Sequence, residues 1–135
     1  MRSVLFVCTG NSCRSQMAEA WSRHFYPDIL SASAGVKAVG INPDAARVML
    51  EVGIDISSHK SETLEVYDGQ QFDLVVTVCD NAKESCPVFF TQGKTLHHSF
   101  DDPPHLAAME SDEQDKLAHY RRVRDEIREF VRQLD

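Results

Sequence analysis

The chain has little positive charge for its size. Its 135 residues include 14 lysines and arginines against 21 aspartates and glutamates, which gives a formal net charge of −7. A nucleic-acid partner requires a basic surface, so this balance argues against one. No apolar run is much longer than a strand, which excludes a membrane-spanning helix and a membrane partner. A signal-peptide pattern is also lacking after Met1, and this predicts a cytoplasmic location.

Cysteine is scarce, with residues at positions 8, 13, 79 and 86 alone. The chain has no Cys-x-x-Cys pair and no clustered Cys/His set, so the spacing does not fit a zinc site. It also lacks the short, cysteine-dense composition of a secreted disulfide scaffold. The cysteines therefore indicate redox chemistry around a reactive thiol.

Short apolar segments alternate with amphipathic ones along the chain. The apolar segments predict four strands, at residues 3–7, 30–34, 72–78 and 94–100. With 42% hydrophobic and 26% charged residues, the composition is typical of a single globular α/β domain over residues 1–135. We expect a four-stranded parallel sheet with helices on both faces, and a ligand at the C-terminal ends of its strands.

Two of the expected helices have assignable inner faces. One begins at Asn42-Pro43, a cap followed by proline, and is predicted to turn Ala46, Met49 and Leu50 inward. The long C-terminal helix carries an apolar stripe of Leu117, Tyr120, Val123, Ile127, Phe130, Val131 and Leu134. The charged residues of its other face are predicted to be solvated, and the small size and this charged helix favour a monomer.

The most informative motif lies between the first strand and the first helix. Its residues, here called the Cys8 loop, are Cys8, Thr9, Gly10, Asn11, Ser12, Cys13, Arg14 and Ser15. Backbone N–H groups of such a loop and the following helix N-terminus form a nest for a phosphate-like anion. Arg14 can bind two oxygens at once, and its charge favours the thiolate form of Cys8, which is the nucleophile. The loop therefore predicts attack on a tetrahedral oxyanion held by residues 9–15.

Cys79 and Cys86 form a second cluster near the same sheet edge. Cys79 ends the third predicted strand, and Cys86 follows a polar segment, residues 80–85. Across a helical segment their Cα atoms would lie roughly 10 Å apart at ~1.5 Å per residue, whereas a disulfide needs about 7 Å or less. Pairing them therefore requires this segment to unwind. Two buried, inert cysteines are the alternative from position alone.

A candidate proton donor follows the last strand, in the Asp-Pro segment (residues 100–103). A positioned aspartic acid can protonate the oxygen that leaves a tetrahedral oxyanion. Asp101 and Asp102 both qualify, and Asp-Pro is also ordinary turn material. We favour Asp102 because Pro103 restricts its backbone to extended conformations.

Together these elements resemble the thioredoxin-coupled arsenate reductases, which share the low-molecular-weight protein tyrosine phosphatase fold. The resemblance covers residues 8–19, 33–35, 39–43, 52–57, 73–79, 100–103 and 120–127. The phosphatases share the Cys8 loop and the Asp-Pro segment. Two features favour the reductases: Gln16 stands where the phosphatases usually have proline, and the chain has the Cys79/Cys86 pair.

The resemblance implies a relay of three cysteines. Cys8 attacks arsenate held by the loop amides and Arg14, and Asp102 protonates the departing oxygen. Cys79 then attacks Cys8, which releases arsenite and leaves a Cys8–Cys79 disulfide. Cys86 attacks Cys79 in turn, and thioredoxin reduces the resulting Cys79–Cys86 disulfide.

The resemblance also implies supporting residues. Asn11, Ser15 and His59 match positions whose hydrogen bonds shape the loop and stabilise the Cys8 thiolate. Cys13 is interpreted as a packed or spare thiol. No tightly bound cofactor is implied, but some family members bind potassium at positions that match Asn11, Glu19, Ser33 and Glu62. The family usually has aspartate where this chain has Glu62, and Pro104 replaces a small residue.

Two other functions remain open from the sequence. The first is a phosphatase acting on phosphotyrosine or small phosphate esters, since arsenate and phosphate share shape and charge. The region after Pro103 lacks the aromatic pair that many of these phosphatases use to hold a tyrosine ring. The second is an oxyanion-binding or redox-sensing module without catalysis, in which Cys8 would be an ordinary protonated thiol near neutral pH.

Overall fold

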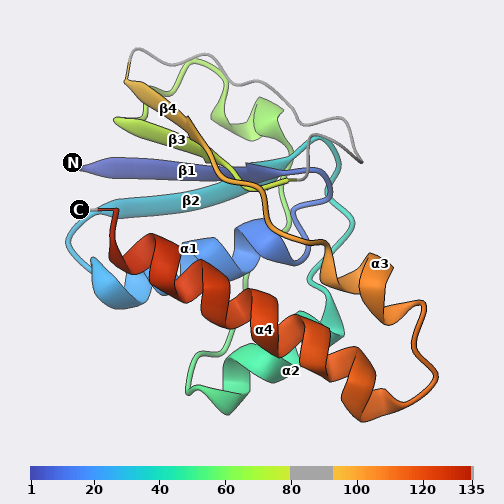
Figure 1. The fold of residues 1–135 in the computed structure, drawn as a ribbon. Coiled ribbons are helices and arrows are strands. Elements are labelled where there is room, and N and C mark those ends of the chain that lie inside the picture. The colour runs from blue at the N-terminus through green and yellow to red at the C-terminus, as the bar shows by residue number, and fades with distance from the viewer. Residues whose placement is uncertain (80–92, 135) are drawn as a thin grey trace.

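A parallel sheet lies at the centre of the molecule (Figure 1). The computed structural model describes residues 1–79 and 93–134, so Cys86 and the 80–85 segment lie outside the described residues. The strands are β1 (Ser3–Cys8), β2 (Leu30–Gly35), β3 (Leu74–Thr77) and β4 (Lys94–His97). They lie in the order β2-β1-β3-β4, and every neighbouring pair is parallel. The predicted four-stranded parallel sheet is confirmed.

The composition of β1 explains its place inside the sheet. Successive side chains of a strand point to opposite faces, and both faces of an interior strand are buried. Val4 and Phe6 belong to the core beneath the α-helices, whereas Leu5 and Val7 belong to a smaller core on the other face. A continuous apolar run therefore fits this position.

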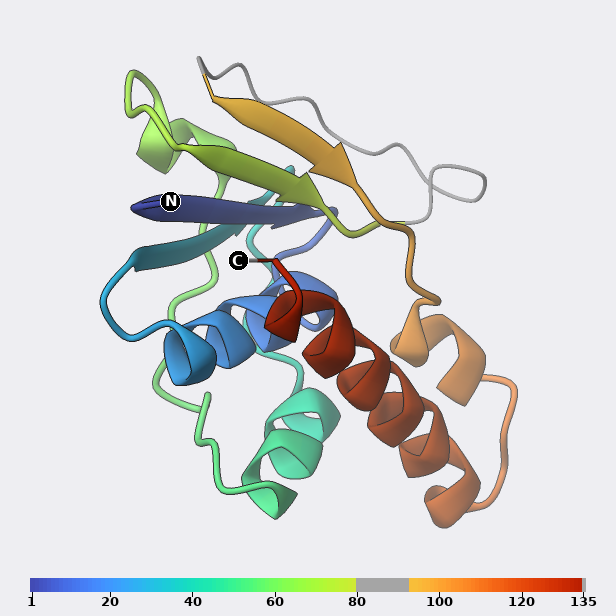
Figure 2. The ribbon, with the colours of Figure 1, turned by 60° about the vertical axis from the view of Figure 1, so that its left-hand side comes forward.

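Helical elements cover both faces of the sheet, though unequally. The elements are α1 (Arg14–Phe25), α2 (Pro43–Glu51), η1 (Leu64–Tyr67), α3 (Pro103–Ala107) and α4 (Glu113–Arg132). In Figures 1 and 2 the α-helices lie on one side of the sheet. The 3-10 helix η1 packs Leu64 and Tyr67 against the smaller core on the other side. Helices on both faces were predicted, and in the described ranges a 3-10 helix covers the second face.

The start of α2 was predicted correctly, but its inner face was not. Asn42 caps the helix, because its Oδ1 accepts hydrogen bonds from the N–H groups of residues 44 and 45 at 2.9 and 3.0 Å. The buried residues are Ala45, Val48 and Met49, whereas Leu50 is 61% exposed. The prediction was wrong for Leu50 because the stripe that contacts α4 lies one residue earlier, about 100° around the helix.

The apolar stripe of α4 packs as predicted, and one charged residue packs with it. Leu117, Tyr120, Val123, Ile127 and Val131 are buried. Arg124 is also buried, and its Nη1 donates to the Val48 carbonyl at 2.9 Å. The Trp21 indole N–H donates to the Arg124 carbonyl at 3.2 Å, so one residue joins α1, α2 and α4.

No helix among the described residues combines the length and the apolar character that a membrane crossing needs.

Candidate active site

The Cys8 loop lies at the C-terminal edge of the sheet, as predicted. Cys8 ends β1 and pairs in register with Gly35 of β2, and Arg14 begins α1. Backbone N–H groups of residues 37, 39 and 42 donate to the carbonyls of residues 9, 10 and 12 at 3.0 to 3.2 Å. In a trans, planar peptide the C=O of one residue and the N–H of the next point in opposite directions. Because the carbonyls of residues 9, 10 and 12 point out towards residues 37, 39 and 42, the N–H groups that follow them point to the inner side of the loop, where an anion can bind.

Asn11 holds the loop in shape. It is buried and has a φ of 47°, in the left-handed region. Its Nδ2 donates to Ser15 Oγ at 2.8 Å and to Ser33 Oγ at 2.9 Å. Its Oδ1 accepts from the Glu62 N–H at 2.8 Å and from Gln16 Nε2 at 3.0 Å. The amide therefore ties the loop to α1, β2 and the segment before η1.

The Cys8 thiol contacts Ser15. Cys8 is 3% exposed, and its Sγ lies 2.8 Å from Ser15 Oγ. Ser15 Oγ already accepts a hydrogen bond from Asn11, and a hydroxyl carries a single hydrogen to donate. A Cys8 thiolate would accept a hydrogen bond from the Ser15 hydroxyl, which places a stabilising donor beside the predicted nucleophile.

Arg14 joins the Cys8 loop to the Asp-Pro segment. The side chain of Arg14 is 4% exposed, and Nη1 donates to the Phe100 carbonyl at 3.2 Å. Nη2 lies 3.7 Å from Asp102 Oδ1, and the Asp102 side chain is 38% exposed. Asp102 has a φ of −89° and a ψ of 103°, the extended backbone expected before Pro103. A half-exposed carboxylate thus stands beside the buried guanidinium.

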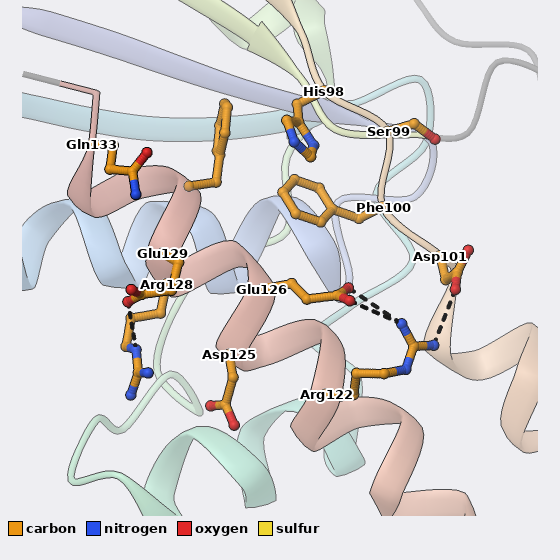
Figure 3. A pocket seen from close by; sticks show the side chains of 11 residues that line it. His98, Ser99, Phe100, Asp101, Arg122, Asp125, Glu126, Arg128, Glu129 and Gln133 are labelled. Carbon is orange, nitrogen blue, oxygen red and sulfur yellow. Dashed lines mark hydrogen bonds and ion pairs between the residues drawn. The ribbon is translucent and has the colours of Figure 1, made fainter.

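Asp101 points to α4 instead (Figure 3). Its Oδ2 lies 3.1 Å from Arg122 Nη2, and Arg122 Nη1 lies 3.3 Å from Glu126 Oε1. These residues line an open groove together with Phe100 and Phe130. The two adjacent carboxylates therefore differ in partner, and it is Asp102 that faces Arg14.

The other predicted thiols have different surroundings. Burial raises the pKa of Cys13 well above its usual value, which supports its interpretation as a packed thiol. Cys79 is fully buried just beyond β3, and the register of Val7 with Thr77 puts it at the same sheet edge as Cys8. Cys8 and Cys13 are free, whereas Cys79 is disulfide-bonded.

His59 reaches the loop through another side chain. Its Nδ1 lies 3.2 Å from Gln16 Oε1 and 3.7 Å from Glu19 Oε2. Burial lowers the pKa of His59, and the Glu19 carboxylate opposes this effect. A supporting role for His59 would therefore act by way of Gln16.

The residues matched to a potassium site are linked to each other. Ser33 Oγ donates to Glu19 Oε1 at 2.7 Å, and Arg23 Nη2 lies 2.8 Å from Glu19 Oε2. Both lone pairs of Asn11 Oδ1 are engaged by protein donors, and the Glu62 carboxylate accepts from the Tyr67 hydroxyl at 3.4 Å. This arrangement does not fit a resident cation, so potassium binding stays a prediction that requires these contacts to open. In the part of the chain that the structure describes, no three His, Cys, Asp or Glu side chains are grouped to hold a metal ion.

The sequence reasoning missed several residues that shape the site. A Cβ on Gly35 would lie 2.7 Å from the Thr9 carbonyl oxygen, so glycine is needed for the loop to pack on β2. Ser61 Oγ donates to the Asn11 carbonyl at 2.8 Å. Gln16 was used only as a family mark, although it contacts the loop directly. The glycine at the end of β2, Gly35, was the one signal in the sequence that pointed to close packing of the Cys8 loop on this strand.

The α/β fold thus has a loop with a cysteine and an arginine between its first strand and first helix, and an aspartate beside that arginine. The chain belongs to the low molecular weight phosphotyrosine protein phosphatase family, whose model matches residues 3–135.

Several relatives within this fold are arsenate reductases. The arsenate reductase of Halalkalibacterium halodurans is 46% identical over 125 residues, which are 92% of this chain and 88% of the relative. A crystal structure of the Archaeoglobus fulgidus arsenate reductase superposes with a TM-score of 0.77 at 32% identity and covers 97% of each chain. A solved arsenate reductase in a phosphate binding state has a TM-score of 0.73 at 29% identity, covering 99% of this chain and 96% of that one. The predicted resemblance and fold are confirmed.

Proposed function

We propose that the protein reduces arsenate to arsenite. The observation that carries this proposal is the grouping of Cys8, Arg14 and Asp102, with Cys8 2.8 Å from Ser15 and Asp102 3.7 Å from Arg14. Similarity to arsenate reductases over nearly the whole chain supports it. So does the phosphate binding state of one of them, because phosphate has the shape and charge of arsenate.

In the first step, the loop N–H groups and Arg14 hold arsenate, and the Cys8 thiolate attacks arsenic. A sulfur–arsenic bond forms while an arsenic–oxygen bond breaks. Asp102 gives its proton to the departing oxygen, which leaves as water. Arg14 balances the negative charge that the oxyanion carries through this exchange.

The electrons then come from thiols. The Cys79 thiolate attacks Cys8 Sγ, and the electron pair of the sulfur–arsenic bond passes to arsenic, which leaves as arsenite. Cys86 attacks Cys79 Sγ and frees the Cys8 thiolate. A thioredoxin dithiol reduces the Cys79–Cys86 disulfide and so replaces the two electrons that arsenic received. Cys8 is free while Cys79 is disulfide-bonded, which supports a sequence of steps that ends with Cys8 regenerated.

The test is arsenate-dependent NADPH oxidation with thioredoxin and thioredoxin reductase present. We expect sustained oxidation for the wild type. Cys86→Ser should release about one arsenite per protein molecule and then stop, because the Cys8–Cys79 disulfide cannot be resolved. Sustained turnover in Cys86→Ser would contradict the relay, and no turnover in the reduced wild type would contradict thioredoxin-dependent reduction itself.

Phosphate ester hydrolysis is the second candidate, because the matching family model is a phosphatase model. The Cys8 loop and Asp102 would serve this reaction unchanged, and Cys79 would have no role in it. We expect slow hydrolysis of p-nitrophenyl phosphate that Cys79→Ser leaves intact, while arsenate reduction by the same variant is lost. Rapid, phosphotyrosine-selective hydrolysis without arsenate reduction would favour the phosphatase.

A further inference from the structure

Gln16 is a buried amide beside the Cys8 loop for which the relay gives no role. It has no exposed surface, although it lies in the first turns of α1. Its Nε2 lies 3.3 Å from the Asn11 carbonyl oxygen, 3.0 Å from Asn11 Oδ1 and 3.0 Å from the Lys60 carbonyl oxygen. Its Oε1 lies 3.2 Å from His59 Nδ1. Gln16 thus joins α1, the loop and the segment before η1.

The residue that Gln16 contacts twice has an unusual backbone. Among residues 1–79 and 93–134, Asn11 is the one non-glycine residue with a positive φ, 47°. That conformation is sterically unfavourable for a residue with a Cβ, and Asn adopts it when local hydrogen bonds hold it. Gln16 Nε2 faces both the carbonyl and the side-chain oxygen of Asn11, and this pair of contacts fixes the peptide and the side chain together.

A chain of contacts leads from this amide to the nucleophile. Gln16 Nε2 donates to Asn11 Oδ1 at 3.0 Å, Asn11 Nδ2 donates to Ser15 Oγ at 2.8 Å, and Ser15 Oγ lies 2.8 Å from Cys8 Sγ. Gln16 orients the Asn11 amide so that its N–H groups face Ser15 and Ser33. That orientation leaves the Ser15 hydrogen for Cys8.

We propose that Gln16 is a positioning residue that holds Asn11 in its left-handed conformation. In doing so it sets both the oxyanion affinity of the Cys8 loop and the thiolate content of Cys8. The inference rests on the proposed function in taking Cys8 as the nucleophile that meets a tetrahedral oxyanion. It does not require that the oxyanion be reduced.

The test compares Gln16→Met with the wild type. Methionine keeps the length of the side chain and removes its hydrogen bonds. The Asn11 oxygens keep other donors, the Glu62 N–H at 2.8 Å and the Ser61 hydroxyl at 2.8 Å, so folding should survive. The reduced proteins are alkylated with iodoacetamide over a range of pH, and mass spectrometry follows the Cys8 peptide with and without inorganic phosphate.

We expect Gln16→Met to need about five- to tenfold more phosphate for half-protection of Cys8, consistent with the loss of one or two hydrogen bonds. The alkylation profile should also move to higher pH. Ser22→Ala is the matched control, because Ser22 is buried on the same helix and contacts Ser31 at 2.6 Å, away from the loop. It should lower the melting temperature and leave both Cys8 readouts unchanged.

A lower melting temperature with wild-type phosphate protection and alkylation would overturn the proposal and leave Gln16 a structural residue. If Gln16→Met does not fold, Gln16→Glu replaces it, since glutamate keeps the shape and loses the donors to Asn11. The same two outcomes then decide. Both readouts are independent of arsenate turnover, so a wild type that fails to reduce arsenate would remove the proposed function without affecting this result.

Discussion

Gly35 and Asn11 show how single residues set the shape of the Cys8 loop. Gly35 pairs with Cys8 across β1 and β2, and the loop folds back over it. Asn11 adopts the left-handed backbone and satisfies its amide with four partners. The absence of a Cβ at Gly35 and the complete hydrogen bonding of the Asn11 amide therefore determine where the loop N–H groups lie.

Gly35→Ala should damage the loop. An added Cβ would lie 2.7 Å from the Thr9 carbonyl oxygen and 2.8 Å from the Asn11 nitrogen, both backbone atoms that cannot turn away. We expect a loss of about 1–3 kcal/mol in the free energy of unfolding and at least a tenfold weaker binding of phosphate. Urea unfolding and phosphate titration measure the two effects.

Gly53→Ala provides the control for Gly35→Ala. Gly53 has a φ of 84° and open space around its Cα, so alanine there adds backbone strain without a collision. It should destabilise the protein by about 1 kcal/mol and leave phosphate binding unchanged. Equal losses of phosphate affinity in the two variants would refute the packing argument.

His59 should make stability depend on pH. Burial lowers its pKa in the folded state, so between that pKa and the unfolded value of about 6.5 the unfolded chain binds more protons. The stabilisation that comes from burying neutral His59 is therefore fully present above about pH 6.5 and is lost as the pH falls through the pKa of the folded state. His59→Asn should flatten this part of the curve of unfolding free energy against pH, measured by urea unfolding from pH 7.5 to 5. An unchanged slope would contradict the buried neutral form of His59.

At the scale of elements, α4 supports the site without entering it. Arg124 links α4 to α2 and α1, and Arg122 holds Asp101 of the segment that carries the proposed acid. His98 and Phe100 stack with ring centroids 4.4 Å apart, and Phe130 of α4 packs edge-on against Phe100 at 5.6 Å. These contacts fix the Phe100 carbonyl that accepts from Arg14. The position of the acid thus depends on a helix far along the chain.

Arg122→Ala should loosen that attachment. The pair with Asp101 is exposed, so its loss should change stability by less than about 1 kcal/mol. We expect kcat for arsenate reduction to fall about two- to fivefold with little change in KM, because the substitution loosens the Asp-Pro segment and leaves the Cys8 loop in place.

Arg128→Ala is the matched control for Arg122→Ala. Arg128 lines the same groove and pairs with Glu129 of its own helix. Its replacement should leave kcat unchanged. A loss in Arg128→Ala equal to that in Arg122→Ala would show that the groove's charge, and not the link to Asp101, matters.

At the scale of the whole molecule, the net charge of −7 would repel the anionic ligand that we propose. Attraction therefore has to be local, from loop N–H groups and a guanidinium that is 4% exposed. Parallel strands bring the ends of β1 and β3 to one edge, which groups Cys8, Cys79 and the Asp-Pro segment although they are far apart in sequence. The topology assembles the site from these distant segments.

The chain should be a monomer in solution. The outer face of α4 carries Arg121, Arg122, Glu126, Arg128 and Glu129, a charged surface that self-association would have to desolvate. Sedimentation equilibrium should give a mass near 15.2 kDa. A mass of twice that value, independent of salt, would contradict the prediction.

The sequence by itself determined the alternation of strands and helices and the position of the Cys8 loop. These depend on local apolar periodicity and turn chemistry, which neighbouring residues encode. The same local rule, applied to α2, misplaced Leu50, because the partner helix selects the buried stripe.

The tertiary structure alone decided what Gly35 and Gln16 touch and that Arg124 is buried, and it put the favoured Asp102, not Asp101, beside Arg14. Each of these depends on contacts between segments separated by tens of residues, such as Arg14 with Phe100 or Gln16 with Lys60. The local sequence of each segment holds no signal of which distant segment it will contact. Packing of the sheet and helices brings them together, and the chemistry of the site follows from that packing.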